Sequence, residues 1–146
     1  MTAKVSPPNI VILAAGVVML VGSFLSFYGY HSIFSHQSFS FSAWSSAEHF
    51  GLFGIATVAV LCGVVMATQI AIAAFAKGVT LPSNVLGLSW DQIHLALGFQ
   101  AAILMFAFLA RDSGGASLGI GFWLMFLAGI ALLVGAILRV TFATAK

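Results

Sequence analysis

Apolar residues fill four long stretches of the chain, and charged residues occur only at or near the ends of those stretches. Each stretch is long enough to cross about 30 Å of hydrocarbon as a helix, which takes roughly 20 residues. Inside a bilayer the backbone must satisfy its own hydrogen bonds, and a helix does this within a single segment. The sequence therefore predicts an all-α membrane protein, an antiparallel bundle of four transmembrane helices at residues 9–28, 50–76, 90–110 and 118–140.

The connection between the first two spans, residues 29–49, is the longest and has a pattern of its own. Polar and apolar residues alternate over 38–42 (Ser-Phe-Ser-Phe-Ser), which is the period of a strand with one buried face. A matching strand can begin near Tyr28 and Tyr30, with a turn at 35–37. The pattern predicts either a short β-hairpin over the outer end of the bundle or an irregular loop whose aromatic side chains enter the headgroup region.

Two helix starts carry capping signals. In the first span, Ser6 offers an N-cap before the prolines at 7–8, which the first turn of a helix tolerates. In the third span, Ser89 is the expected N-cap, Asp91 lies in the first turn, and Gln92 occupies the reciprocal position of a capping box.

Composition agrees with a membrane protein. Of the 146 residues, 62% are hydrophobic and 5% are charged, whereas soluble domains contain about 25% charged residues. The length fits one domain made almost entirely of spans. The net charge of +2 is spread over separate basic residues, so no basic cluster indicates a nucleic-acid partner.

The distribution of Lys and Arg predicts the orientation in the membrane. The N-terminus, the second connection and the C-terminus carry Lys4, Lys77, Arg139 and Lys146, whereas the first and third connections carry only Arg111. Positive residues stay preferentially on the cytoplasmic side. We therefore expect a multi-pass protein of the cell (inner or plasma) membrane with both termini in the cytoplasm and residues 29–49 outside.

Small residues recur along the second and fourth spans and allow another backbone to approach closely. They indicate tight packing within the bundle or, alternatively, a face that docks onto a partner or a second copy. The residues are Ala59, Gly63, Ala67 and Ala71 in the second span and Gly121, Gly129 and Gly135 in the fourth.

Two amides lie inside spans. Gln69 and Gln100 each fall about 10–12 Å from the same membrane face, at roughly 1.5 Å per helical residue. Because a bare amide is costly in hydrocarbon, we expect a buried polar pair or one shared polar pocket.

Candidate chemistry is sparse. A set of three histidines and a carboxylate falls on the predicted outer side and is of a type that can bind Zn²⁺, but its spacing fits no recognised site; the set is His31, His36, Glu48 and His49. We therefore predict no metal and no cofactor. Charged residues lie only at span ends, and no catalytic pair occurs at compatible depth, so no catalytic residue is assigned and the protein is not expected to be an enzyme.

Several stretches are shared with a known group of proteins. These are residues 23–28 (Ser-Phe-Leu-Ser-Phe-Tyr), Ala43–Trp44, the Gly-rich segment with Gly119, Gly121, Phe122, Trp123 and Leu124, and then Gly135 and Arg139. Through them the chain resembles uncharacterised small four-span integral membrane proteins of high-GC Gram-positive bacteria. The resemblance implies the four-span architecture and implies no activity or binding residues.

The sequence thus favours a non-enzymatic membrane protein that contacts lipids and acts as an accessory or assembly subunit of a larger membrane complex or as a homo-oligomer. One alternative is a lipid- or quinone-binding protein with a pocket near Gln69, Gln100 and His94. The other is a small channel or transporter component.

Overall fold

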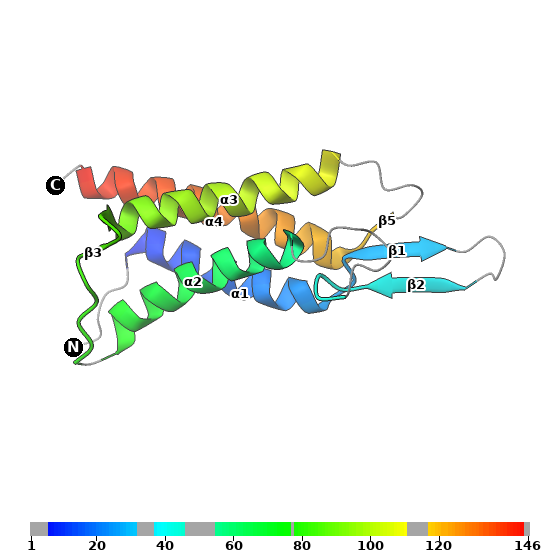
Figure 1. Ribbon diagram of the computed structural model, residues 1–146, viewed down its shortest axis with the longest axis horizontal. Coiled ribbons are helices and arrows are strands. Elements are labelled where there is room, and N and C mark those ends of the chain that lie inside the picture. Colours follow the sequence, from blue (N-terminus) through cyan, green and yellow to red (C-terminus); the bar gives the residue numbers. More distant parts are fainter. Residues whose placement is uncertain (1–5, 32–36, 46–54, 77, 111–116, 145–146) are drawn as a thin grey trace.

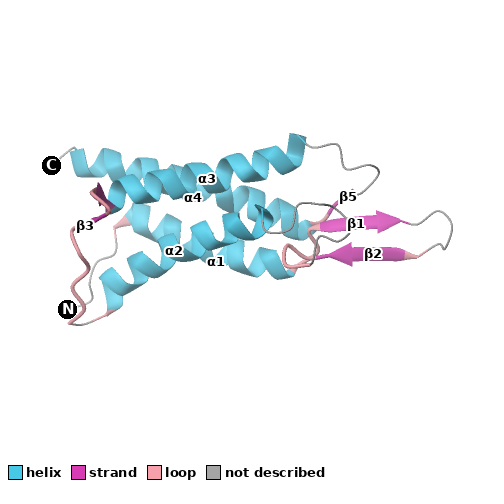
Figure 2. Cartoon of the chain, viewed as in Figure 1, coloured by secondary structure: helices cyan, strands magenta, loops and turns pink. Residues whose placement is uncertain are grey.

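A computed structural model describes residues 6–31, 37–45, 55–76, 78–110 and 117–144. Four long helices form an antiparallel bundle, and a small antiparallel sheet lies at one end of it (Figures 1 and 2). The helices are α1 (Pro7–Phe24), α2 (Ile55–Phe75), α3 (Trp90–Ala110) and α4 (Ile120–Thr144). The strands are β1 (Tyr28–His31), β2 (Ser38–Phe41), β3 (Asn84–Val85), β4 (Leu88–Ser89) and β5 (Ser117–Leu118).

The four helices close into a ring. Helix α1 packs against α2 and α4, and α3 packs against the same two helices from the opposite corner. All four are long and apolar enough to cross a membrane, which confirms the predicted four-helix bundle and makes this a multi-pass membrane protein. Helix α1 begins and α4 ends at one end of the bundle, here called the terminal end, and the β1–β2 hairpin extends from the other, the hairpin end (Figure 1).

The core of the bundle combines small residues and methionines with a few larger apolar side chains. Each helix contributes one fully buried methionine: Met19, Met66, Met105 and Met125. A methionine side chain is unbranched and adaptable, so it fills the irregular space between helices that differ in how closely they approach.

Glycines determine how closely neighbouring helices approach each other. A Cβ atom at Gly16 of α1 would lie 2.6 Å from the Cβ of Ala67 and 2.8 Å from the carbonyl oxygen of Gly63, both on α2. At the start of α4, a Cβ at Gly121 would lie 2.6 Å from the carbonyl oxygen of Gly22 on α1. The α1 backbone therefore meets both neighbours at positions that only a missing side chain permits.

Two predicted spans differ in length from the observed helices. Helix α1 ends at Phe24 instead of residue 28 because Leu25 adopts an extended backbone (ψ 171°) and leads into β1. Helix α4 begins at Ile120 and continues to Thr144, beyond the predicted end at 140. Ser6 does occupy the N-cap of α1, but its side chain makes no capping hydrogen bond.

The first connection forms a hairpin, one of the two structures that the sequence pattern allowed. Strands β1 and β2 pair antiparallel, with Tyr28 opposite Phe41 and Tyr30 opposite Phe39. Strand β5, from the connection before α4, pairs with the other edge of β1 and makes a three-stranded sheet in the order β2-β1-β5. This third strand was not predicted.

Phe27 attaches the sheet to the bundle. Its side chain is 2% exposed, and its ring meets the rings of Phe108 on α3 and Phe122 on α4 edge-on, with centroids 5.2 and 5.4 Å apart. Its backbone N–H donates to the carbonyl oxygen of Phe41, and its carbonyl accepts from the N–H of Gly119. Phe27 thus links β2 and the residue that follows β5 to two helices.

The predicted capping box at the start of α3 is confirmed. The Ser89 N–H donates to Oε1 of Gln92 (2.9 Å), and the Gln92 N–H donates to Oγ of Ser89 (3.4 Å). Just before it, β3 and β4 pair through a tight turn in which Leu86 and Gly87 both have positive φ (53° and 81°), the geometry of a two-residue hairpin of the mirror-image type.

Candidate functional sites

A polar cluster at the terminal end joins three helices. Arg139 of α4 donates from Nε to Oδ1 of Asp91 at the start of α3 (2.6 Å). Its Nη1 donates to Oδ1 of Asn9 in α1 (3.4 Å) and lies 3.2 Å from Nδ1 of His94 in α3. A guanidinium is a planar fork of donors, so one side chain can hold the ends of α1, α3 and α4 together.

His94 is the fully buried member of this cluster. A guanidinium cannot accept a hydrogen bond, so Nδ1 is the acceptor, and a neutral ring then carries its proton on Nε2. That nitrogen is buried and has no hydrogen-bond partner among the described residues. The indole of Trp90 lies against the same ring, with centroids 6.4 Å apart.

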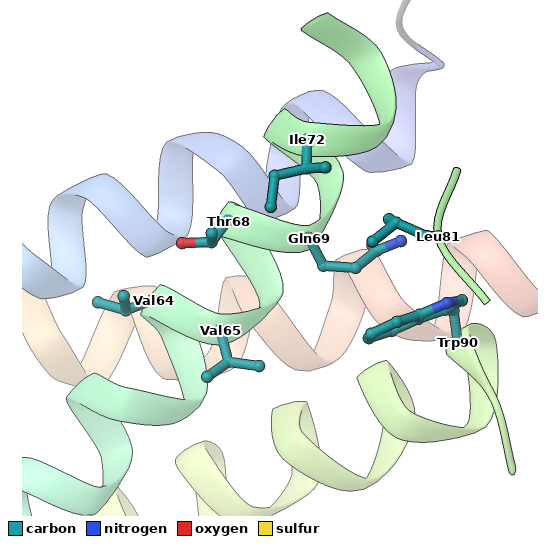
Figure 3. A pocket seen from close by; sticks show the side chains of 7 residues that line it. All are labelled: Val64, Val65, Thr68, Gln69, Ile72, Leu81 and Trp90. Atoms are coloured by element: carbon teal, nitrogen blue, oxygen red, sulfur yellow. The ribbon is translucent and has the colours of Figure 1, made fainter. Parts of the chain in front are cut away.

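A groove of about 270 Å³ opens beside this cluster, between α2 and the start of α3. Gln69 extends from α2 toward Leu81 and Trp90 on the far side of the groove (Figure 3). The rest of the lining is almost entirely apolar; it comprises Val64, Val65, Thr68 and Ile72 from α2. Of the three residues predicted near a pocket, Gln69 lines this groove, whereas Gln100 and His94 do not. Trp90 and Leu81 line it but were not predicted to do so.

Gln69 and Gln100 do not form the expected buried pair. Gln69 is buried, but Gln100 is exposed. The reason is helical geometry: Gln100 follows Gly98 by two residues, which is about 200° around the helix. Gly98 faces α4, where a Cβ would lie 3.0 Å from Cα of Leu133. Gln100 therefore points away from the neighbouring helix.

The predicted small-residue positions lie against the chain's own helices. Ala59 and Gly63 are buried, and Ala67 and Ala71 are half-buried. In α4, the contact partners of an added Cβ would come from α1 at Gly121 and Gly135 and from α3 at Gly129. These contacts are those of internal helix packing.

Of the four residues considered as metal ligands, the structure describes one. His31 is exposed at the end of β1, and His36, Glu48 and His49 lie outside the described residues. Within the described ranges, no group of three or more His, Cys, Asp or Glu side chains could hold a metal ion.

Buried polar side chains in the described part of the chain are Ser23, Gln69 and His94. Ser23 lies at the hairpin end, where its Oγ donates to the carbonyl oxygen of Leu20 and accepts from Nε1 of Trp44 (2.8 Å). Gln69 and His94 lie toward the terminal end. The buried interior of the described bundle is therefore apolar at mid-depth.

No family model matches the chain, and no curated protein matches it. The resemblance to small four-span bacterial membrane proteins accordingly stays a prediction.

Proposed function

We propose that this chain is a non-enzymatic membrane subunit that pairs with a second copy of itself through the exposed face of α3. The observation that carries the proposal is Gln100, an exposed amide within an apolar span. Gln100 lies ten residues after Trp90, the first residue of the 21-residue α3, which is about 15 Å along the helix and near the middle of the span.

Gln100 belongs to a regular row of exposed residues. The spacing along the row alternates between four and three, which is the repeat of a seam in a left-handed helix pair. Three of its members are alanines, which allow two backbones to approach closely. The row, here called the α3 seam, consists of Ala96, Gln100, Ile103, Ala107 and Ala110.

Two-fold symmetry favours a second copy of the chain as the partner of the α3 seam. Two copies inserted in the same orientation place their α3 helices parallel, and a two-fold axis between them brings each seam residue opposite its counterpart. An amide both donates and accepts hydrogen bonds, so Gln100 is complementary to Gln100 of the second copy. Pairing also removes the amide from hydrocarbon, where an unsatisfied polar group is costly.

The interior supports a subunit more than a channel or transporter component. The described buried polar side chains lie toward the two ends of the bundle, with apolar residues and four methionines between them. A polar path across the membrane needs polar or ionisable groups at mid-depth. The exposed amide at mid-depth therefore favours contact with another helix.

Cysteine cross-linking in membranes tests the geometry. With Cys62 replaced by Ala, we expect disulfide-linked dimers from Q100C, I103C and A107C. The matched controls are F99C and F106C, which place cysteines at positions that are also exposed on α3 but off the seam. Efficient cross-linking at the controls and none at the seam would contradict the proposal.

Replacing the amide tests its contribution. We expect Gln100→Leu to weaken pairing by roughly 3- to 30-fold, since a hydrogen bond between membrane helices contributes about 0.6–2 kcal/mol and 1.4 kcal/mol is a tenfold change. Energy transfer between labelled copies in vesicles, over a range of protein-to-lipid ratios, measures the change. Phe99→Leu is the control, and an equal effect of both variants would remove Gln100 from the interface.

A further inference from the structure

The groove beside Trp90 contains a buried polar group that the fold does not satisfy. Gln69 is 7% exposed, and its Oε1 has no hydrogen-bond partner within the described part of the chain. Leaving a buried amide group without a partner costs free energy that the apolar surroundings do not return. A molecule in the groove that supplies a hydrogen bond would recover part of that cost.

The other polar groups of the groove are directed elsewhere. The indole N–H of Trp90 already donates to the carbonyl oxygen of Pro82 (2.8 Å). The Thr68 hydroxyl points away from Gln69 (Figure 3). The Gln69 amide is therefore the polar group available to a ligand, and the flat ring of Trp90 forms an apolar wall next to it.

Size and charge narrow the class of ligand. A volume of about 270 Å³ falls just below the range of about 300–1,000 Å³ for whole small-molecule sites, so the groove fits one end of a longer molecule. Its lining has no charged side chain, and the nearby Arg139 is already paired with Asp91. An anionic headgroup would find no counter-charge among the described residues that line the groove.

The groove also opens toward the lipid. Val65, in its lining, is 47% exposed on a helix that is long and apolar enough to span the membrane. A hydrocarbon chain can therefore leave the groove directly into the bilayer while its polar end stays at Gln69.

We propose that this groove binds a neutral membrane lipid through a free hydroxyl group, as found in diacylglycerol. A hydroxyl both donates and accepts, so it pairs with the Gln69 amide in either orientation of that amide. The apolar part of the lipid packs along Trp90 and Val65.

Trp90 provides the readout. In a protein with Trp44→Phe and Trp123→Phe, Trp90 is the remaining tryptophan, and its fluorescence is quenched by brominated lipid in contact with it. In vesicles we expect brominated diacylglycerol to quench at about a two- to tenfold lower mole fraction than brominated phosphatidylcholine, the range that one net hydrogen bond provides. Unbrominated diacylglycerol should reverse the quenching.

Two variants test whether the preference for diacylglycerol depends on the groove. Gln69→Leu keeps an apolar groove and should abolish the preference for diacylglycerol. Val65→Phe fills the groove from an exposed position and should also abolish it, and Val58→Phe, on the same helix but outside the lining, should not. Repeating the experiment with Gln100→Leu separates this site from the α3 seam.

Equal quenching by the two brominated lipids would overturn the proposal, because it would show only general exposure of Trp90 to lipid. A preference that survives in both Gln69→Leu and Val65→Phe would also overturn it. So would stronger quenching by a brominated anionic lipid than by brominated diacylglycerol.

Discussion

At the scale of single residues, the glycines of this bundle differ in how much space an added side chain would find. Gly16 and Gly129 both lie in helix interiors. An added Cβ at Gly16 would lie 2.6 Å from the Cβ of Ala67 and 2.8 Å from a backbone oxygen on α2, whereas at Gly129 the nearest atoms lie 3.4 Å away. The first contact cannot relax without moving a helix, and the second is ordinary packing.

We therefore expect Gly16→Ala to lower the free energy of unfolding by about 1–3 kcal/mol, the usual cost of overpacking a core. Gly129→Ala is the matched control and should be neutral or stabilising by up to about 1 kcal/mol, because alanine favours the helix. Unfolding in mixed micelles with increasing dodecyl sulfate measures both. Similar losses in the two variants would show that helix α1 does not approach α2 as closely as described.

Contacts between residues close in sequence could be predicted, whereas contacts between distant segments could not. The capping box was predictable because Ser89 and Gln92 are three residues apart on one chain segment. The pairing of Arg139 with Asp91 was not, because only the ring of helices brings the two together. The exposure of Gln100 was also missed: a span that is apolar on every side does not reveal which face packs on its neighbours.

At the scale of elements, the sheet at the hairpin end depends on Phe27. The ring of this residue packs on α3 and α4, and its backbone hydrogen-bonds to Phe41 of β2 and to Gly119, which follows β5. The alternation over 38–42 indicated the hairpin but did not exclude an irregular loop. Strands β3, β4 and β5 have two residues each, too few to show any period, so they could not be read from the sequence.

We expect Phe27→Ala to loosen the sheet, because removing a buried phenylalanine costs about 3–5 kcal/mol. Amide hydrogen exchange should accelerate at Gly119 and Gly121, whose N–H groups donate to the carbonyls of Phe27 and Ser26. Phe39→Ala is the control: it removes the same side chain from a 47% exposed position on β2 and should leave those amides unchanged. Equal acceleration in both variants would contradict the anchoring role of Phe27.

At the scale of the whole molecule, the start of α1, the end of α4 and the connection between α2 and α3 lie at one end, and the hairpin lies at the other (Figure 1). This arrangement follows from four antiparallel spans and was predictable from the apolar runs alone. Which end faces the cytoplasm depends on the Lys and Arg distribution, a bias that acts during insertion and leaves no trace in the packing.

Thiol labelling of intact cells tests the orientation. With Cys62 replaced by Ala, we expect S38C on β2 to react with a membrane-impermeant reagent, and S83C, before β3, to react only after permeabilisation; both serines are exposed. The opposite result would invert the orientation. Reaction of both cysteines in intact cells would contradict a membrane-spanning bundle between them.

The contact of α1 with α4 bears on the order in which the protein assembles. Of the four helices of the bundle, α1 is synthesised before the other three, and it completes its packing only when α4 arrives, which is also when Asp91 receives the cation of Arg139. Until α4 is inserted, helices α1–α3 form an open set in which Asp91 lacks its partner cation. A product truncated before α4 therefore differs from the four-helix bundle in charge as well as in packing.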